Sequence, residues 1–323
     1  MNKRIDWIDT ARGIAMILVV WGHLYPPMTA RMWIYSFHMP LFFFLSGYLY
    51  KKRGTKESIV VRSKKLLVPY FLTAILSFPI GIFLDRYLGN SVTIGSKISE
   101  VFFLNGTVGW NSPIWFLIVL YLVEVFFAMV DKIKPIWIAI ASLLVGYLLY
   151  ITSVTLVFGI QIALWMLPFY CLGMIVKKNN FLNKDIKNLK ALALGITLMV
   201  VNGVIAISSG VVAEIYHNIL GNYWMFYVNA IIGIFGIIFI SMYLPNIKFI
   251  KEVSVNSLFI LCSHYIIYYF FVFVNSRFSE NILLDYKLLP SVFMTCSAFV
   301  LYKIYFILKD NLIKKRSYSK DAV

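Results

Sequence analysis

The sequence predicts an all-α membrane protein of about ten transmembrane helices, and three observations point to that class. Hydrophobic residues make up 61% of the 323 positions and charged residues only 14%, which is too apolar for a soluble domain. Apolar runs of about 20 residues, the length that crosses a bilayer as a helix, recur along the chain. These runs lack the alternating polarity of the strands in a membrane barrel.

Ten apolar runs can be placed in order, with boundaries uncertain by a few residues. No short-period repeat, low-complexity tract or proline-rich linker divides the chain, so residues 1–323 are expected to form one integral-membrane domain. The N-terminus starts like a signal peptide but lacks a small-residue cleavage site, so it is expected to remain as the first helix. The runs are 7–26, 32–50, 66–88, 112–130, 135–151, 157–176, 190–208, 223–244, 255–275 and 287–308.

The basic residues predict how these spans are oriented. Of the 30 lysines and arginines, 23 fall in segments on the same side as the two termini and 5 fall on the other side. Basic segments favour the cytoplasm, so both the N- and the C-terminus are expected there. This distribution explains the net charge of +16 without a nucleic-acid partner. The expected location is the cytoplasmic membrane of the cell, as a multi-pass protein in contact with membrane lipids.

The cysteines give no reason to expect a disulfide or a metal site. Cys171, Cys262 and Cys296 each lie within an apolar run, without a nearby cysteine or histidine at ligand spacing. We therefore expect packing roles for them and no bound metal.

The first span carries two residues that hydrocarbon tolerates poorly. Arg12 and His23 are 11 positions apart, which at about 100° per residue puts them on one face of a helix. A rise of 1.5 Å per residue separates them by about 16 Å along the axis, with Arg12 nearer the cytoplasm. Such side chains usually face a protein interior or a watery cavity. The alternative is that His23 bonds a neighbour while Arg12 snorkels or pairs with Asp9.

The second span and the segment after it hold further candidates. The stretch FHMPLFFFLSGYLY at 37–50 places His38 at a depth comparable with His23. The stretch KKRGTKESIVVRSKKLLVPYF at 51–71 carries seven basic residues and one acidic residue. Arginine and lysine both bind phosphate oxygens, so this segment is a candidate phosphate site. Positive-inside bias, or contact with anionic lipid headgroups, explains the same composition.

Together these pieces resemble the acyltransferase-3 family of integral-membrane O-acyltransferases. The resemblance rests on Arg12 followed after ten residues by His23, on the LSG element of the second span, and on Arg62-x-x-Lys65 before LLVPY. The sequence FHMPLFFFLSGY is similar to that of members of the branch that acetylates sugars and cell-surface polysaccharides.

Two later stretches also fit, and two positions depart from the family pattern. WFLIVLYL at 115–122 fits, and SVNSLFILCSHYII at 254–267 looks like the family's C-terminal helix that runs from a serine to a histidine. Lys65 replaces the usual second arginine of the basic motif and loses its planar fork. No acid lies five residues after Trp115, where some branches have one, and Glu124 is not its equivalent.

The resemblance implies transfer of an acyl group, acetyl in the sugar-modifying branch, from cytoplasmic acyl-CoA to a hydroxyl of an extracytoplasmic glycan or lipid-linked sugar. Acetyl-CoA or another acyl-CoA is then a co-substrate, and no tightly bound cofactor is expected. Arg62, Lys64 and Lys65 would hold the CoA phosphates. His23 would be the general base on the acceptor hydroxyl, with a transient acyl-histidine as the competing route. Arg12 would neutralise donor phosphate or orient a water chain.

Other polar residues in the spans are expected to support the catalytic and phosphate-binding residues or to hold the helices together. Asp9, His38 and His264 are candidate supporting residues, although a buried, hydrogen-bonded structural histidine explains His264 equally well. Glu124 and Lys303 are expected to pair or snorkel rather than to catalyse. Interhelical hydrogen bonds are expected for Gln161, Asn202 and Asn229.

Two other classes of function fit part of the sequence. A transporter or flippase of a glycan or a small acylated molecule also has many spans and intramembrane charges, but no convincing pair of repeated halves is visible. In a membrane scaffold or sensor, the basic segment would only contact lipid.

Overall fold

The computed structural model describes residues 5–52, 54–87, 89, 91, 93–102, 108–182, 189–244, 247–277, 283 and 285–320, the last eleven of these as backbone only. Every regular element within these residues is a helix, which confirms the predicted all-α class. The elements are α1 (Asp6–His23), α2 (Met28–Tyr35), α3 (His38–Tyr48), α4 (Thr55–Arg62), the π-helical turn η1 (Ser63–Leu67), α5 (Val68–Tyr87), α6 (Ile94–Val101), η2 (Ser112–Ile114), α7 (Trp115–Met129), α8 (Pro135–Ile151), η3 (Val157–Gly159), α9 (Ile160–Lys178), α10 (Leu189–Ser208), η4 (Ile215–His217), α11 (Tyr223–Tyr243), α12 (Lys248–Val255), α13 (Ser257–Asn275) and α14 (Leu288–Lys320).

Seven helical segments among the described residues are long and apolar enough to cross a membrane. The apolar helix α8 is shorter, with 17 residues, and α1 has three charged residues within its 18. A total of ten spans therefore stays a prediction. The seven are Thr55–Tyr87, Ser112–Met129, Val157–Lys178, Leu189–Ser208, Tyr223–Tyr243, Ser257–Asn275 and Leu288–Lys309.

The predicted span 32–50 differs from the structure, which divides it into α2 and α3. The chain breaks at Ser36 and Phe37, where Phe37 has φ −142° and ψ −22°. Pro40 explains the break, because a proline ring clashes with the carbonyl group four residues earlier, here that of Ser36. The break turns His38 into the first residue of α3.

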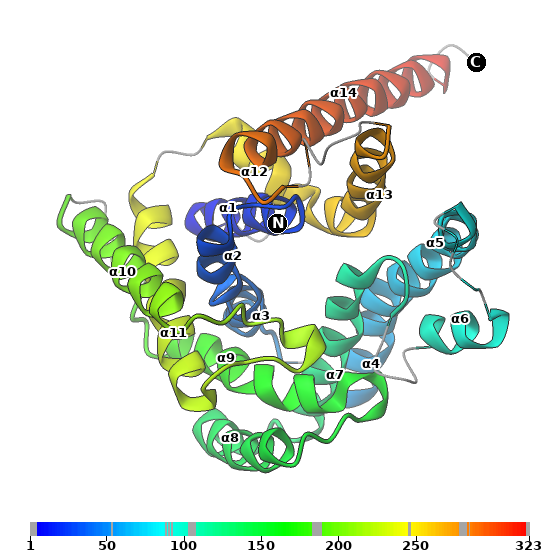
Figure 1. Cartoon of the computed structure of the whole chain (residues 1–323). Helices are drawn as coiled ribbons and strands as arrows, with labels where there is room; N and C mark the ends of the chain where they lie inside the picture. The colour runs from blue at the N-terminus through cyan, green and yellow to red at the C-terminus, as the bar shows by residue number, and fades with distance from the viewer. Residues whose placement is uncertain are drawn as a thin grey trace.

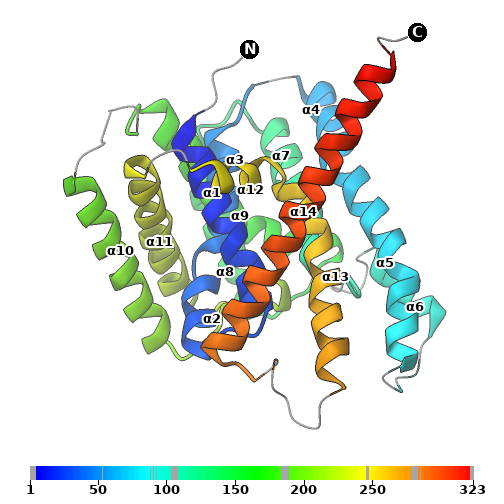
Figure 2. The same ribbon diagram turned by 90° about the horizontal axis from the view of Figure 1, so that it is seen from above.

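The two termini lie at one end of the molecule, and α4 lies there too (Figure 2). From that end α1 runs to the opposite end, where α2 follows it. The N-terminus and C-terminus are therefore on the same side of the bundle. Which side of the membrane that is remains the prediction made from the basic residues.

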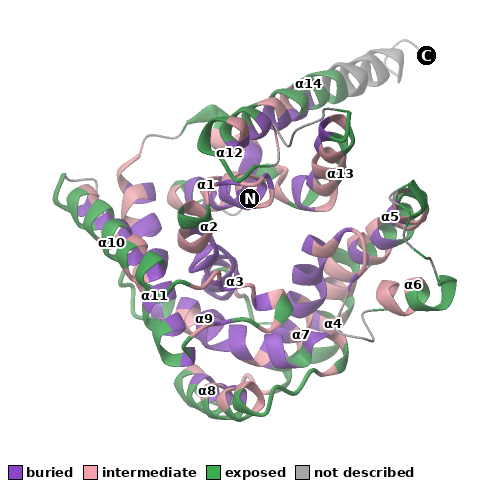
Figure 3. Ribbon diagram, in the orientation of Figure 1, coloured by how far each residue is buried: buried purple, intermediate pink, exposed green. Residues whose placement is uncertain are grey.

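Helix α1 lies inside the bundle and contacts α2, α3, α11, α12, α13 and α14 (Figure 1). Two glycines mark the closest helix crossings. A Cβ on Gly13 would collide with the carbonyl oxygen of Ile250 in α12, and a Cβ on Gly47 in α3 would collide with that of Tyr170 in α9. Small residues of this kind allow membrane helices to approach closely. Burial follows the same pattern, because α1, α3 and α9 are mostly buried and α10 is mostly exposed (Figure 3).

Several polar residues link helices as predicted. Asn202 Nδ2 donates to Asn229 Oδ1 at 2.8 Å, which joins α10 to α11. Lys303 forms an ion pair with Glu252, and Glu124 forms one with Arg62. The predicted interhelical bond between the two asparagines is therefore confirmed. The prediction that Glu124 and Lys303 each form an ion pair is confirmed as well.

Candidate active site

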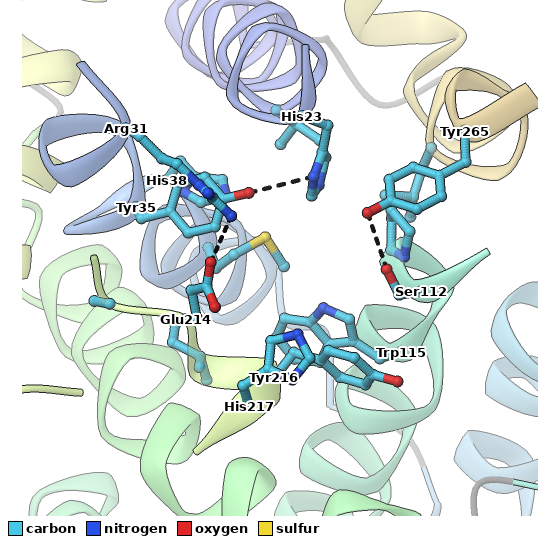
Figure 4. Close-up of a pocket in the computed structure, with 16 residues that line it drawn as sticks. His23, Arg31, Tyr35, His38, Ser112, Trp115, Glu214, Tyr216, His217 and Tyr265 are labelled. Atoms are coloured by element: carbon cyan, nitrogen blue, oxygen red, sulfur yellow. Dashed lines mark hydrogen bonds and ion pairs between the residues drawn. The ribbon is translucent and has the colours of Figure 1, made fainter. Parts of the chain in front are cut away.

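All four histidines of the chain lie in or beside one pocket at the α2 end of α1 (Figure 4). His23, His38 and His217 line the pocket, and the ring centroid of His264 is 5.2 Å from that of His23. The pocket has a volume of about 100 Å³. Its walls come from α1, α2, α3, η2, α7, η4 and α13, so elements from the whole length of the chain build it.

His23 is the last residue of α1, and its ring contacts three other aromatic rings. The Tyr35 hydroxyl lies 3.2 Å from His23 Nδ1, and the ring of Tyr265 lies edge-on at a centroid distance of 5.1 Å. Two tautomers fit the bond to Tyr35. With the proton on Nδ1, that N–H donates to the tyrosine oxygen and Nε2 keeps the lone pair that a general base needs.

His38 and His264 are held by the backbone. His38 Nδ1 lies 2.7 Å from the carbonyl oxygen of Ile34, and His264 Nδ1 lies 3.0 Å and 2.9 Å from those of Ile260 and Leu261. Because a carbonyl oxygen only accepts, Nδ1 carries a proton in both rings, and in the neutral form of each ring Nε2 holds the lone pair. Both side chains are buried, and among the described atoms His264 Nε2 has no hydrogen-bond partner. Among the described residues no group of three His, Cys, Asp or Glu side chains is placed to hold a metal ion.

The segment between α10 and α11 supplies one wall of the pocket. Glu214 forms an ion pair with Arg31 of α2, and the Tyr216 hydroxyl accepts a hydrogen bond from the backbone N–H of Val108. Burial raises the pKa of Tyr216 to about 12, so its phenol stays neutral at ordinary pH. The rings of Tyr216 and Trp115 are nearly parallel, with centroids 6.2 Å apart.

A short segment before α7 fixes the position of α13. Asn111 Nδ2 donates to the carbonyl oxygen of Cys262 at 2.7 Å, and Ser112 Oγ donates to the Tyr265 hydroxyl at 3.1 Å. Tyr269 completes the set by donating to the carbonyl oxygen of Trp110 at 3.2 Å. Positions 262, 265 and 269 lie on one face of the helix. This anchoring holds the Tyr265 ring against His23.

Arg12 and Asp9 lie near the other end of α1, away from the pocket. The Asp9 side chain is buried, and its Oδ1 accepts a hydrogen bond from Ser254 Oγ at 3.1 Å. Arg12 is half-buried. The helix is continuous from Asp6 to His23, so Arg12 stays about 16 Å from His23 along the axis. The structure therefore brings His23, His38 and His264 together but does not add Arg12 or Asp9 to that group.

The predicted phosphate ligands lie at the last residue of α4 and in the turn η1 after it, at the end of the molecule that holds the termini (Figure 2). Arg62 Nε lies 2.8 Å from Glu124 Oε2, and Glu124 is buried in α7. Lys64 and Lys65 are exposed in the π-helical turn η1. Single π-helical turns occur often at functional sites. The basic residues and the histidine pocket thus lie at opposite ends of the bundle.

Sequence patterns did not single out several residues of the pocket. Arg31, Tyr35, Glu214, Tyr216 and Tyr265 all line it. One clue was available, since Arg31 is among the few basic residues on the predicted outer side, where positive-inside bias does not explain it.

Comparisons with known proteins agree with these motifs. The chain is 29% identical over 191 residues to the nodulation protein NolL of Sinorhizobium fredii (strain NBRC 101917 / NGR234), and 28% identical over 198 residues to the NolL of Mesorhizobium japonicum (strain LMG 29417 / CECT 9101 / MAFF 303099). Each match covers 54% of this chain, which spans about half the length of these curated relatives (49% and 48%). No solved structure matches the chain. A family model described as an acyltransferase domain matches residues 5–309. Because this match covers nearly the whole chain, the protein belongs to the acyltransferase-3 family, whose members are embedded in membranes.

Proposed function

We propose that the protein is an O-acyltransferase of the cytoplasmic membrane. It moves an acyl group, acetyl in the simplest case, from cytoplasmic acyl-CoA to a hydroxyl of an extracytoplasmic glycan or lipid-linked sugar. The observation that carries the proposal is the separation of two sites in one bundle. A group of basic residues, Arg62, Lys64 and Lys65, lies near the termini, and a pocket lined by histidines lies at the far end of α1.

Arg62, Lys64 and Lys65 bind the phosphates of the donor. The ion pair through Nε orients Arg62, which leaves its terminal N–H groups to reach a phosphate oxygen. Lys64 and Lys65 are exposed and add point charges at the same place. Glu124 therefore acts as a positioning residue for Arg62. The thioester arm of the donor extends from there into the bundle beside α1.

His23 is the general base in this proposal. The acceptor oxygen attacks the thioester carbonyl carbon while its proton passes to His23 Nε2. The carbon–sulfur bond then breaks, and the imidazolium returns the proton to the leaving thiolate, so no net proton is consumed. This step needs the tautomer in which His23 Nδ1–H donates to the Tyr35 oxygen, which is one of the two that the bond to Tyr35 allows.

The tetrahedral intermediate needs a hydrogen-bond donor for its oxyanion, and Tyr265 fits that role. Its oxygen already accepts from Ser112 Oγ at 3.1 Å, so its own proton remains available to the pocket. A phenol held in a buried site and aimed at developing negative charge stabilises the transition state. Tyr265 lines the pocket next to His23, which is where the reacting carbon would lie.

The experiment that tests this function compares surface glycans by mass spectrometry. Cells that carry the native gene should show an acyl mass increment that cells with His23→Gln or no gene lack. A control variant, Tyr25→Phe, changes a residue outside the pocket lining and should retain most of the increment. Equal acylation in the native and His23→Gln cells, with both proteins present in the membrane, would contradict the assignment of His23.

A further inference from the structure

We propose that the segment 209–222, between α10 and α11, selects the acceptor, and that Arg31 and Glu214 together bind the hydroxyl groups of an uncharged sugar ring. This inference rests on the proposed function, because it takes the pocket beside His23 as the place where the acceptor binds. To the proposed function it adds two points: which residues select the acceptor, and that the selected sugar ring is uncharged.

The segment enters the pocket through five consecutive residues, Ala213 to His217, all of which line it. Within this segment, the residues on both sides of the turn η4 are held in place. Before η4, Glu214 pairs with Arg31. After it, Asn218 accepts from Gln161 Nε2 at 3.1 Å and donates from Nδ2 to Thr155 Oγ1 at 3.0 Å. The segment is therefore a fixed wall of the pocket, and its side chains are pre-arranged for a ligand.

The charges of the pocket favour an uncharged ligand. Among the described residues that line it, the only Asp, Glu, Lys or Arg side chains are Arg31 and Glu214, and these two neutralise each other. Each is 23% exposed, so both charges are largely removed from water. A carboxylate or ammonium group on the ligand would lose its hydration without meeting an unpaired opposite charge.

Sugar hydroxyls match this pair chemically. A hydroxyl group both donates and accepts, so one hydroxyl can donate to the Glu214 carboxylate while a neighbouring hydroxyl accepts from the Arg31 guanidinium. The ion pair joins Nη2 of Arg31 to Oε1 of Glu214, so the pair alone does not use the second terminal nitrogen of the guanidinium or the second carboxylate oxygen. The ion pair therefore keeps hydrogen-bonding capacity for a diol.

The aromatic side chains supply the second feature that a sugar ring needs. Trp115, Tyr216 and His217 lie across the pocket from His23 (Figure 4). The rings of Trp115 and Tyr216 are within 21° of parallel, so they offer flat apolar faces to the C–H face of a sugar. Arg31 and Tyr35 are one helical turn apart on α2, so a ring bound at Arg31 places another of its hydroxyls near the imidazole that Tyr35 contacts.

Glu214→Gln tests the inference, because it leaves the positive charge of Arg31 uncompensated. The assay uses the purified full chain in lipid nanodiscs, saturating radiolabelled acetyl-CoA, and matched methyl glycosides: glucoside with glucuronide, and galactoside with galacturonide. In each pair the uronide carries a carboxylate at C6 in place of the hydroxymethyl group of the neutral member. We expect the native protein to prefer the uncharged member of each pair.

In Glu214→Gln we expect KM for the uncharged glycosides to rise about tenfold or more, because a charge-assisted hydrogen bond is lost. The ratio of kcat/KM for uronide to that for neutral glycoside should also rise by about tenfold, while KM for acetyl-CoA stays unchanged. The control is Glu252→Gln, which removes a carboxylate from an ion pair in α12, outside the pocket. It should keep the native preference.

Two results would overturn the inference. One is an equal fall of kcat/KM for both members of each pair in Glu214→Gln, since this is what a merely structural ion pair predicts. The other is that the native protein prefers the uronides or acetylates no uncharged glycoside. A His23-dependent acyl increment on surface glycans, found together with either result, would retain the proposed function and reject only this inference. If the His23-dependent acyl increment is absent as well, the proposed function is rejected together with this inference.

Discussion

The Tyr35 hydroxyl lies 3.2 Å from His23 Nδ1, so a side chain of α2 sets the orientation of the imidazole that ends α1. Tyr35→Phe removes this oxygen and keeps the ring, which packs against His38 at a centroid distance of 5.0 Å. We expect kcat to fall about 10²-fold, because general base catalysis depends on the correct tautomer, and KM for acetyl-CoA to stay unchanged. Steady-state kinetics of the purified protein measures both.

A matched control for this variant is Tyr25→Phe. The Tyr25 hydroxyl bonds the Tyr268 hydroxyl at 2.9 Å, outside the pocket lining, so the same chemical change there should leave kcat near the native value. An equal loss of kcat in the two variants would argue against a specific role for the oxygen of Tyr35.

Tyr265→Phe tests the proposed oxyanion donor. We expect kcat to fall about 10²- to 10³-fold, the usual effect of removing one such donor. Ser112→Ala should cost less, because Tyr265 keeps its own proton and loses only the bond that it accepts. If Ser112→Ala is the more damaging of the two, Tyr265 acts through its position rather than through its proton.

Local features of the sequence predicted the helices but not the full pocket. The all-α class follows from the length and composition of the apolar runs, which are properties of single segments. The continuous helix Asp6–His23 keeps Arg12 and His23 on one face, as the spacing of 11 predicted. The structure divides the span predicted at 32–50 into α2 and α3, because Pro40 prevents one continuous helix there.

The pocket could not be predicted in full because its walls come from distant parts of the chain. Arg31 and Glu214 are 183 positions apart, and Ser112 and Tyr265 are 153 apart. No periodic pattern links residues at such separations, and their contact depends on how the helices pack. His38 and His264 could be chosen because imidazoles are rare in spans, whereas tyrosines are common throughout this chain and none was singled out.

The basic turn after α4 gives a prediction about the donor. Lys64→Ala combined with Lys65→Ala should raise KM for acetyl-CoA about tenfold, because two charge-assisted contacts to phosphate are lost from an exposed site. The dependence of KM on salt concentration should become weaker, since fewer charges attract the donor. Kinetics at two ionic strengths measures both effects.

The control for this variant is Lys132→Ala combined with Lys134→Ala. These two exposed lysines lie between α7 and α8, so the variant removes the same net charge from the chain. It should leave KM for acetyl-CoA near the native value. Equal effects of the two double variants would mean that overall charge, rather than a site at Lys64 and Lys65, attracts the donor.

The crossing of α3 and α9 predicts a stability effect that is separate from catalysis. At Gly47 an added Cβ would collide with the carbonyl oxygen of Tyr170, and backbone atoms cannot rotate away as a flexible side chain can. Gly47→Ala should therefore force the helices apart and destabilise the protein by about 1–3 kcal/mol, the usual cost of overpacking. Gly54→Ala is the control, because nothing lies within 4 Å of a Cβ at Gly54, where φ is −60°. Thermal unfolding of both variants in the same detergent should show a lower Tm for Gly47→Ala alone, and a native Tm for that variant would contradict the close crossing of α3 and α9.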